Sequence, residues 1–277
     1  MKTIGKANQL IEAFQEVIEH PKPYSGHKQL YSGVDLGTAY TVLAVVDEDG
    51  APVAGAMRFA QVVRDGLVVD YHGAVEIVGE LKAKIENSLD AELLQAGIAY
   101  PPGTSEGDQK AFRYIAEAVG FEVAVSIDEP SAANNVLNIE NGAVVDIGGG
   151  TTGIAIIEDG RVAYLADEPT GGVHVSLVIS GACKIPFEKA EKLKNDSNHH
   201  QMLLPTIKPV IEKFTTIIRQ HIQNRNVDKV FLVGGTGCFT QFETIIEAEL
   251  HLPVIKPANP FLVTPLGIAL EVTKACS

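Results

Sequence analysis

Two short segments, about 110 residues apart, constrain the fold of this chain more than any other feature. Each has an apolar, largely β-branched run, an aspartate, and then glycine and threonine; the segments are Val34–Thr41 and Val144–Gly153. Glycine lets backbone N–H groups approach an anion closely, and threonine adds a hydroxyl donor. Two such turns facing one another would hold a polyphosphate from both sides. Because carboxylates repel phosphate, we expect Asp35 and Asp146 to hold the water shell of a bridging Mg²⁺.

Either turn alone is equally typical of a tight hairpin. A third apolar strand also runs into glycines, at Phe231–Gly237, and a helical pattern follows it. Three strand-to-glycine turns in one chain favour a nucleotide-binding cleft over three unrelated hairpins.

With these residues in view, the chain resembles the actin-like ATPase superfamily, which includes the DnaK-type chaperones, bacterial actins, cell-division actins and sugar kinases. More narrowly, it is similar to a chaperone-like family encoded with genes for ethanolamine utilisation and bacterial microcompartments. The narrower resemblance rests on Val62–Gly66, Tyr100–Thr104, Val144–Ala155 and Ala166–Gly172. The five superfamily motifs occur in order as the first phosphate turn (34–41), first connecting helix (129–133), second phosphate turn (144–153), adenosine turn (231–237) and second connecting helix (264–269).

The strand, turn and strand pattern that begins at Val34 recurs after residue 142, so the chain has two similar halves. The fold class that the resemblance implies is α/β, a two-lobed actin-like ATPase (ribonuclease H-like) fold with the nucleotide cleft between the lobes. We expect an N-terminal amphipathic helix and linker at 1–30, lobe I at 31–141 with 264–277 returning to it, and lobe II at 142–263.

The resemblance implies ATP or ADP with Mg²⁺ as cofactors and catalytic roles for Asp35, Asp146 and Glu129. Glu129 would orient a water near the terminal phosphate, although a carboxylate at a helix start is also typical of a cap. Glu191 and Lys194 match the ribose-contacting helix, but a pair spaced i, i+3 is equally typical of a solvated surface. The expected nucleotide-binding residues are Gly37, Thr38, Tyr40, Gly148, Gly149, Gly150, Thr151, Gly171, Gly172, Glu191, Lys194, Gly234, Gly235 and Thr236.

Three departures from the superfamily pattern concern hydrolysis rather than binding. Gly153 stands where DnaK-type chaperones have an acidic residue and bacterial actins commonly a glutamate. Phe261 stands where those chaperones carry a further acidic residue. The catalytic lysine has no clear counterpart, although Lys82 and Lys84 lie in the corresponding part of the chain. The sequence therefore supports nucleotide binding better than fast hydrolysis.

Bulk properties limit the partners. The formal net charge of −13 disfavours nucleic acid and anionic membranes. Three scattered cysteines suit a reducing compartment, and no apolar run is long enough to span a membrane, so we expect a cytoplasmic protein. The resemblance implies an association with a microcompartment. The expected partner is a protein client or a microcompartment component.

Two polar or amphipathic segments carry further expectations. Residues 7–19 place apolar side chains on one helical face before Pro21, which predicts either a helix packed on its domain or a detachable docking peptide. The polar segment Lys194–Gln201 predicts an exposed loop with solvated His199 and His200.

The leading functional hypothesis is an ATP-binding, slowly hydrolysing DnaK-like chaperone or assembly factor of ethanolamine utilisation. The alternatives are an actin-like polymerising scaffold, which Arg64–Val69 favours by its resemblance to bacterial actins, and a small-molecule kinase of the same superfamily. A kinase would need an additional substrate pocket, for which a chain of 277 residues leaves little room.

Overall fold

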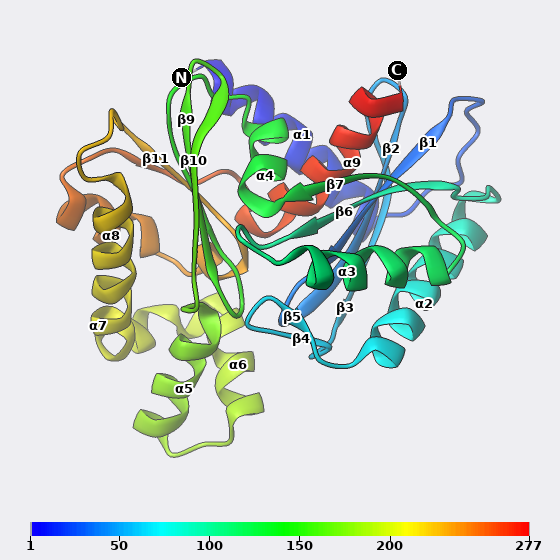
Figure 1. Ribbon diagram of the computed structural model, residues 1–277. Coiled ribbons are helices and arrows are strands. Elements are labelled where there is room, and N and C mark those ends of the chain that lie inside the picture. The colour runs from blue at the N-terminus through cyan, green and yellow to red at the C-terminus, as the bar shows by residue number, and fades with distance from the viewer. Residues whose placement is uncertain (1, 277) are drawn as a thin grey trace. The chain divides into compact units, whose positions relative to one another are not determined.

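The computed structural model describes residues 2–276 and divides into two compact units (Figure 1). Unit 1 takes the residues up to Asn138 together with those from Leu262 onward, and unit 2 is Ile139–Phe261. Each unit contains one five-stranded mixed sheet with helices packed on it. The fold is therefore α/β.

The sheet of unit 1 has the strand order β3-β2-β1-β6-β7. The first three strands in the chain form an antiparallel meander, and β6 and β7 then add parallel to β1. A small hairpin, β4–β5, follows β3. The strands are β1 (Leu30–Leu36), β2 (Tyr40–Asp47), β3 (Pro52–Phe59), β4 (Val63–Arg64), β5 (Leu67–Val68), β6 (Gln95–Tyr100) and β7 (Glu122–Asp128).

Helices cover both faces of this sheet. On one face α2 (Tyr71–Leu89) and α3 (Glu106–Ala118) enclose the main apolar core of the unit. Side-chain caps start both, because Asp70 accepts from Gly73 N at 2.9 Å and Ser105 from Asp108 N at 3.2 Å. The other face carries α1 (Lys2–Glu19), α4 (Glu129–Leu137) and α9 (Val263–Cys276).

Helix α1 packs on unit 1, as the first of the two expectations for it states. It begins earlier than its apolar pattern predicts and contacts β3, α4 and α9. Ala7, Ile11 and Phe14 are buried, and a Cβ at Gly55 of β3 would meet Phe14 and Ile18 at 2.7 Å. The bare backbone of β3 thus lets the helix lie close to the sheet.

The sheet of unit 2 repeats the topology of the first, with the order β10-β9-β8-β11-β12. Again an antiparallel meander comes first, and two strands then add parallel to its first member. The strands are β8 (Gly142–Ile147), β9 (Thr152–Glu158), β10 (Arg161–Glu168), β11 (Val230–Val233) and β12 (Val254–Ile255). The two halves that the sequence pattern predicts therefore share one strand order.

The helices of unit 2 lie mainly between β10 and β11 in the chain. The long helix α7 places Ile207, Ile211, Phe214 and Ile218 in one core with Val145 and Ile154 of the sheet. The helices are α5 (Gly172–Cys183), α6 (Phe187–Asn195), α7 (Ser197–Ile222) and α8 (Phe242–Leu250), with short 3₁₀ turns η1 (Gly235–Cys238) and η2 (Pro260–Leu262).

The expected exposed loop at Lys194–Gln201 is wrong. Helix α6 continues to Asn195, and α7 begins at Ser197 with Asp196 as its cap, which accepts from Asn198 N at 3.0 Å. His200 is buried, stacks on Phe239 at 3.8 Å between ring centroids, and lies 2.7 Å from the Lys194 carbonyl. A polar run here marks a junction between two packed helices rather than a solvated loop.

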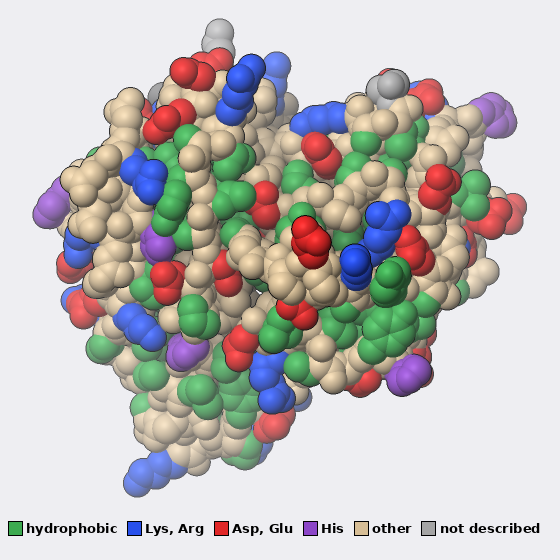
Figure 2. All heavy atoms as spheres, in the orientation of Figure 1, with side chains coloured by type: hydrophobic (Ala, Val, Ile, Leu, Met, Phe, Trp, Pro, Cys, Tyr) green, Lys and Arg blue, Asp and Glu red, His purple; other side chains and the backbone are tan. Residues whose placement is uncertain are grey.

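Acidic and basic side chains are interspersed on the face of the molecule drawn in Figure 2. None of the helices within residues 2–276 has a stretch that is both apolar enough and long enough to cross a bilayer.

Candidate nucleotide site

The first phosphate turn joins β1 to β2 in unit 1. Gly37 N donates to the Tyr40 carbonyl at 3.0 Å and closes the turn. Within the described chain, the backbone N–H groups of Thr38 and Ala39 have no hydrogen-bond partner, so both can donate to an anion. Asp35 lies on the sheet face that α9 covers, because Gly33, two residues earlier, packs against Ala269 and Pro265.

The second phosphate turn joins β8 to β9 in unit 2 with the same closing bond, from Gly148 N to the Thr151 carbonyl at 3.0 Å. Here the N–H groups of Gly149 and Gly150 find no partner among residues 2–276. Asp146 is buried, with 6% of its surface exposed. Both turns thus present backbone donors beside an aspartate, the arrangement expected for phosphate with hydrated Mg²⁺.

The start of α5 supports the second turn. Gly172 N donates to the Gly148 carbonyl at 2.9 Å, and Val173 N donates to the Gly149 carbonyl at 2.8 Å. A Cβ at Gly171 would lie 2.6 Å from the Gly149 carbonyl oxygen, so only glycine fits. Gly171 and Gly172 therefore hold the turn in place.

The adenosine turn contacts the same structure from β11. The Thr236 hydroxyl donates its single proton to the Gly148 carbonyl at 2.8 Å. Gly234 has a φ of +87°, and a Cβ there would lie 2.3 Å from Asp146 Oδ1. Gly235 lies against the ring of Phe261, which would be 3.2 Å from an added Cβ. The glycines of this turn thus make room for the Asp146 carboxylate and for an aromatic ring.

Glu191 and Lys194 form a buried ion pair, so the solvated-surface interpretation is wrong. Their closest atoms lie 2.8 Å apart, and each side chain is 8% exposed. The Ser176 hydroxyl donates to Glu191 at 2.5 Å, and Lys194 Nζ also donates to the Gly172 carbonyl at 3.3 Å. Burial lowers the pKa of the Lys194 ammonium, and Glu191 opposes that shift. The pair places a cation beside the start of α5.

The two connecting helices, α4 and α9, pack closely in unit 1. Asp128, not Glu129, caps α4, because it accepts from Ser131 N at 2.9 Å. Glu129 is the first helical residue, so its expected role near a phosphate remains a prediction. Gly267 of α9 lies so close to α4 that a Cβ would overlap the Ala132 carbonyl, and Asn135 Nδ2 donates to the Gly267 carbonyl at 3.0 Å.

Lys82 is a packing residue of unit 1. It pairs with Glu86 at 2.8 Å, and its ammonium lies 5.2 Å from the centroid of the Phe121 ring. The buried Lys82 side chain therefore contacts Glu86 of its own helix, α2, and the ring of Phe121.

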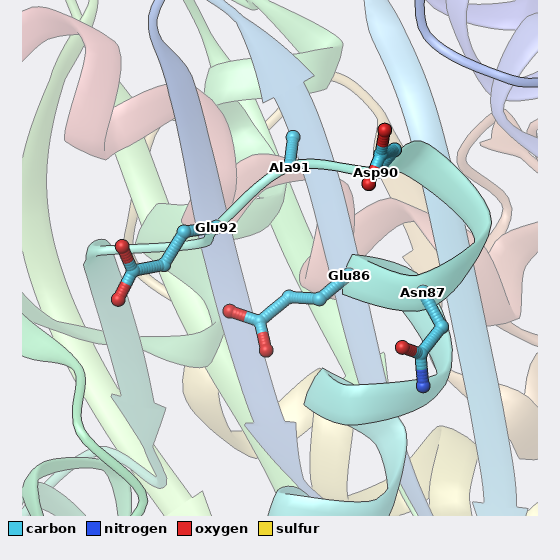
Figure 3. Close-up of a pocket in the computed structure, with 5 residues that line it drawn as sticks. All are labelled: Glu86, Asn87, Asp90, Ala91 and Glu92. Atoms are coloured by element: carbon cyan, nitrogen blue, oxygen red, sulfur yellow. The ribbon is translucent and has the colours of Figure 1, made fainter.

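An acidic surface depression of ≈ 360 Å³ lies elsewhere in unit 1, where α2 ends before β6 (Figure 3). Glu86, Asp90 and Glu92 line it, and Glu86 is engaged by Lys82 and by Leu93 N. It lies beside the amino end of β6, whereas the first phosphate turn follows the carboxyl end of the parallel strand β1. The depression is therefore at the opposite edge of the sheet from the phosphate turn.

Sequence reasoning missed Asp167 as a candidate site residue. Strand register places Gly153 of β9 opposite both Asp146 of β8 and Asp167 of β10. Asp167 is partly buried and accepts a hydrogen bond from the Thr151 side chain. The aspartate lies only four residues before Gly171, but its facing depends on a register that the sequence does not reveal.

Two family models match the chain. The model of the MreB/Mbl protein matches residues 51–195, and that of the cell division protein FtsA matches residues 143–267. Together they include the second phosphate turn and the adenosine turn.

Individual relatives give a narrower match. The chain is 40% identical to the ethanolamine utilization protein EutJ of Salmonella typhimurium, over 89% of this chain and 87% of the relative. The crystal structure of EutJ from Carboxydothermus hydrogenoformans superposes with a TM-score of 0.92 and 46% identity, covering 97% of this chain and 99% of that one. MreB5 of Spiroplasma citri bound to ADP shares the fold, with a TM-score of 0.70 and 17% identity over 90% of this chain and 98% of that one. The chain therefore belongs to the EutJ family, whose fold is that of the actin-like ATPases.

Proposed function

We propose that this protein binds ATP and ADP with Mg²⁺ and uses the nucleotide state to change its conformation. The observation that carries the proposal is the repeated phosphate turn: in each unit a glycine N–H closes the turn and the next N–H groups stay available. Each turn, with its backbone donors and the aspartate beside it, suits a phosphate group and the water shell of its cation.

We assign each residue a role in nucleotide binding from the chemistry of its polar groups. The N–H groups of Thr38, Gly149 and Gly150 donate to phosphate oxygens, while Asp35 and Asp146 accept from water in the Mg²⁺ shell. Mg²⁺ in proteins usually keeps several of its waters and is held through one or two carboxylates, which suits Asp35 and Asp146. Glu129 orients a water near the terminal phosphate, and Glu191 and Lys194 contact the ribose.

Membership of the EutJ family supports a role for this protein in ethanolamine utilisation. We infer a chaperone-like or assembly role in which ATP and ADP favour different conformations, and a protein of the ethanolamine microcompartment distinguishes them. Its support is the identity with EutJ proteins along most of the chain. The loss of a carboxylate at Gly153 supports slow turnover, which suits a switch.

Calorimetric titration with ATP and with ADP, each with and without Mg²⁺, tests the proposal. The unaltered protein is expected to bind both nucleotides in a Mg²⁺-dependent way, and the double variant Asp35→Ala, Asp146→Ala is expected to lose that binding. The matched control is Asp49→Ala, Asp228→Ala, which removes one aspartate from each unit where the side chains are 69% and 66% exposed. Absence of binding by the unaltered protein would contradict the proposal and indicate a scaffold that has lost its nucleotide.

A polymerising scaffold is the second candidate. Leu67 of the hairpin β4–β5 and Val69, just after it, have 46% and 53% of their surfaces exposed and lie inside the region matched by the MreB/Mbl model. Filaments would appear as ATP-dependent light scattering that the variant Leu67→Ser, Val69→Ser lowers. No scattering at high protein concentration would exclude this candidate.

A further inference from the structure

A row of residues across the sheet of unit 2 brings two carboxylates to one face beside the second phosphate turn. Asp146 of β8 pairs with Gly153 of β9, which pairs in turn with Asp167 of β10. Residues paired directly across neighbouring strands point to the same face. The middle residue has no side chain, so Asp146 and Asp167 flank bare backbone at Cα positions about 10 Å apart.

The next residue along β10 confirms which face Asp167 occupies. Glu168 accepts from His221 Nε2 of α7 at 2.9 Å, and Tyr164 lies 2.9 Å from the other nitrogen of the same ring. Because side chains alternate along a strand, Asp167 points away from α7, to the face that Asp146 shares. Glu168 is therefore a natural control: same charge, one residue away, opposite face.

Asp167 is tied to the second phosphate turn through Thr151. The Thr151 hydroxyl donates to the Asp167 carboxylate, whose Oδ1 is buried and has no hydrogen-bond partner within the described chain. Burial raises the pKa of the Asp167 carboxyl to about 7, with the Thr151 bond opposing and Asp146 and Glu168 adding to the shift.

This bond decides what Thr151 can do. A threonine hydroxyl has one proton and two acceptor lone pairs. When the proton is directed to Asp167, the oxygen of Thr151 keeps its two lone pairs as acceptors, in the same turn as the available N–H groups of Gly149 and Gly150. An acceptor next to phosphate-binding donors suits a water molecule better than a phosphate oxygen.

We propose that Asp167 is a positioning residue that orients Thr151. From strand β10 it supplies the carboxylate that is missing at Gly153 of the neighbouring strand β9. Thr151, held by Asp167, then accepts a hydrogen bond from the water that attacks the terminal phosphate. The inference rests on the proposed nucleotide function. In the step it assists, the water oxygen bonds to the terminal phosphorus as the bond from that phosphorus to the bridging oxygen of ADP breaks. ADP keeps the electron pair of the broken bond, and both water protons leave with the inorganic phosphate as dihydrogen phosphate. Asp167 acts through Thr151 and contacts no substrate atom.

Four proteins test this role: the unaltered chain, Asp167→Asn, Thr151→Val and the double variant. The measurements are Mg²⁺-dependent ATP and ADP affinities by calorimetry, thermal unfolding, and single-turnover phosphate release. The expected result is that Asp167→Asn slows phosphate release about tenfold or more while its ADP affinity changes less than about twofold. The double variant is expected to be no slower than Thr151→Val, because both changes remove one interaction. Glu168→Gln is the matched control and keeps the rate of the unaltered chain.

Each remaining outcome contradicts the proposal in a distinguishable way. If the unaltered protein fails to bind ATP, the nucleotide function and this inference both fall. If it binds ATP but Asp167→Asn releases phosphate at the unaltered rate, or no phosphate is released at all, only the role of Asp167 falls. Equal losses of ATP affinity, ADP affinity and thermal stability in Asp167→Asn would show a structural carboxylate.

Discussion

The two phosphate turns begin alike and are supported differently. In each, the glycine after the strand donates to the carbonyl three residues later at 3.0 Å. The second turn is then fixed by the start of α5 and by Thr236, while the structure records for the first an additional bond from Ala60 N to the Ala39 carbonyl at 2.9 Å. The repeated sheet topology produces a similar turn in each unit. The bonds from the start of α5 and from Thr236 hold the second turn more firmly in the conformation that can bind phosphate.

The ion pair of unit 2 is also more deeply buried than the corresponding pair of unit 1. Glu191 and Lys194 are buried, and they contact Ser176 and the Gly172 carbonyl. Lys82 and Glu86 of unit 1 lie on α2, where Glu86 is 25% exposed. Breaking a buried ion pair is costly because water does not reach the charge that remains. We therefore expect the Glu191–Lys194 pair, which lies beside the start of α5, to be the part of the second turn's support that is most sensitive to mutation.

The largest expected effect is on that pair. Lys194→Met leaves the Glu191 carboxylate buried without its cation and is expected to lower the free energy of unfolding by about 3–5 kcal/mol. Lys82→Met, the counterpart in unit 1, is expected to cost about 1 kcal/mol, because water reaches Glu86. Urea unfolding measures both, and equal losses would contradict the difference between the units.

Crowding at the start of α5 is the next test. A Cβ at Gly172 would lie 2.3 Å from Thr236 Oγ1, so Gly172→Ala is expected to cost about 1–3 kcal/mol by overpacking and to weaken ATP binding. Gly181→Ala on the same helix meets no atom within 4 Å and is expected to stabilise by about 0.5–1 kcal/mol. Thermal unfolding and calorimetry would compare them; a neutral Gly172→Ala would show that α5 does not clamp the turn.

Substituting the aspartate beside each turn compares how much the two turns contribute to Mg²⁺–ATP affinity. Asp146→Asn is expected to weaken Mg²⁺–ATP binding about tenfold, or about 1.4 kcal/mol, and Asp35→Asn by less. The reason is that Asp146 is 6% exposed and its charge is less screened than that of the partly exposed Asp35. Titration at two salt concentrations should find the effect of Asp35→Asn more salt-dependent; the reverse order would mean that the first turn dominates binding.

The last prediction concerns pH in the absence of nucleotide and Mg²⁺. The pKa of the Asp167 carboxyl rises from 3.8 to about 7 on folding, mainly through burial. Its contribution to stability is therefore full below pH 3.8, falls as pH rises toward about 7, and is flat above. Asp167→Asn should melt at the same temperature as the unaltered protein in acid and at a higher temperature at pH 8. A melting-temperature difference independent of pH would contradict the buried carboxyl.

Much of the site follows from local pattern. An apolar run ending in aspartate, glycine and threonine predicts a strand and a tight turn, and both turns form where the pattern places them. The errors concern polar residues. His200 is expected from the sequence to be solvated but is buried, and the solvated alternative for Glu191 and Lys194 is wrong as well, because sequence alone does not show which polar side chains a neighbouring helix covers.

The sequence by itself determined the repeated turns, the strand and helix pattern and the resemblance to actin-like ATPases, because each depends on residues that are neighbours in the chain. Only the tertiary structure decided that the Glu191–Lys194 pair is buried beside α5 and that Asp167 shares a face with Asp146. Those facts depend on strand register and helix packing. A shift of one residue in the pairing of β10 with β9, or of β9 with β8, would turn Asp167 toward α7. No local sequence pattern therefore reveals its position.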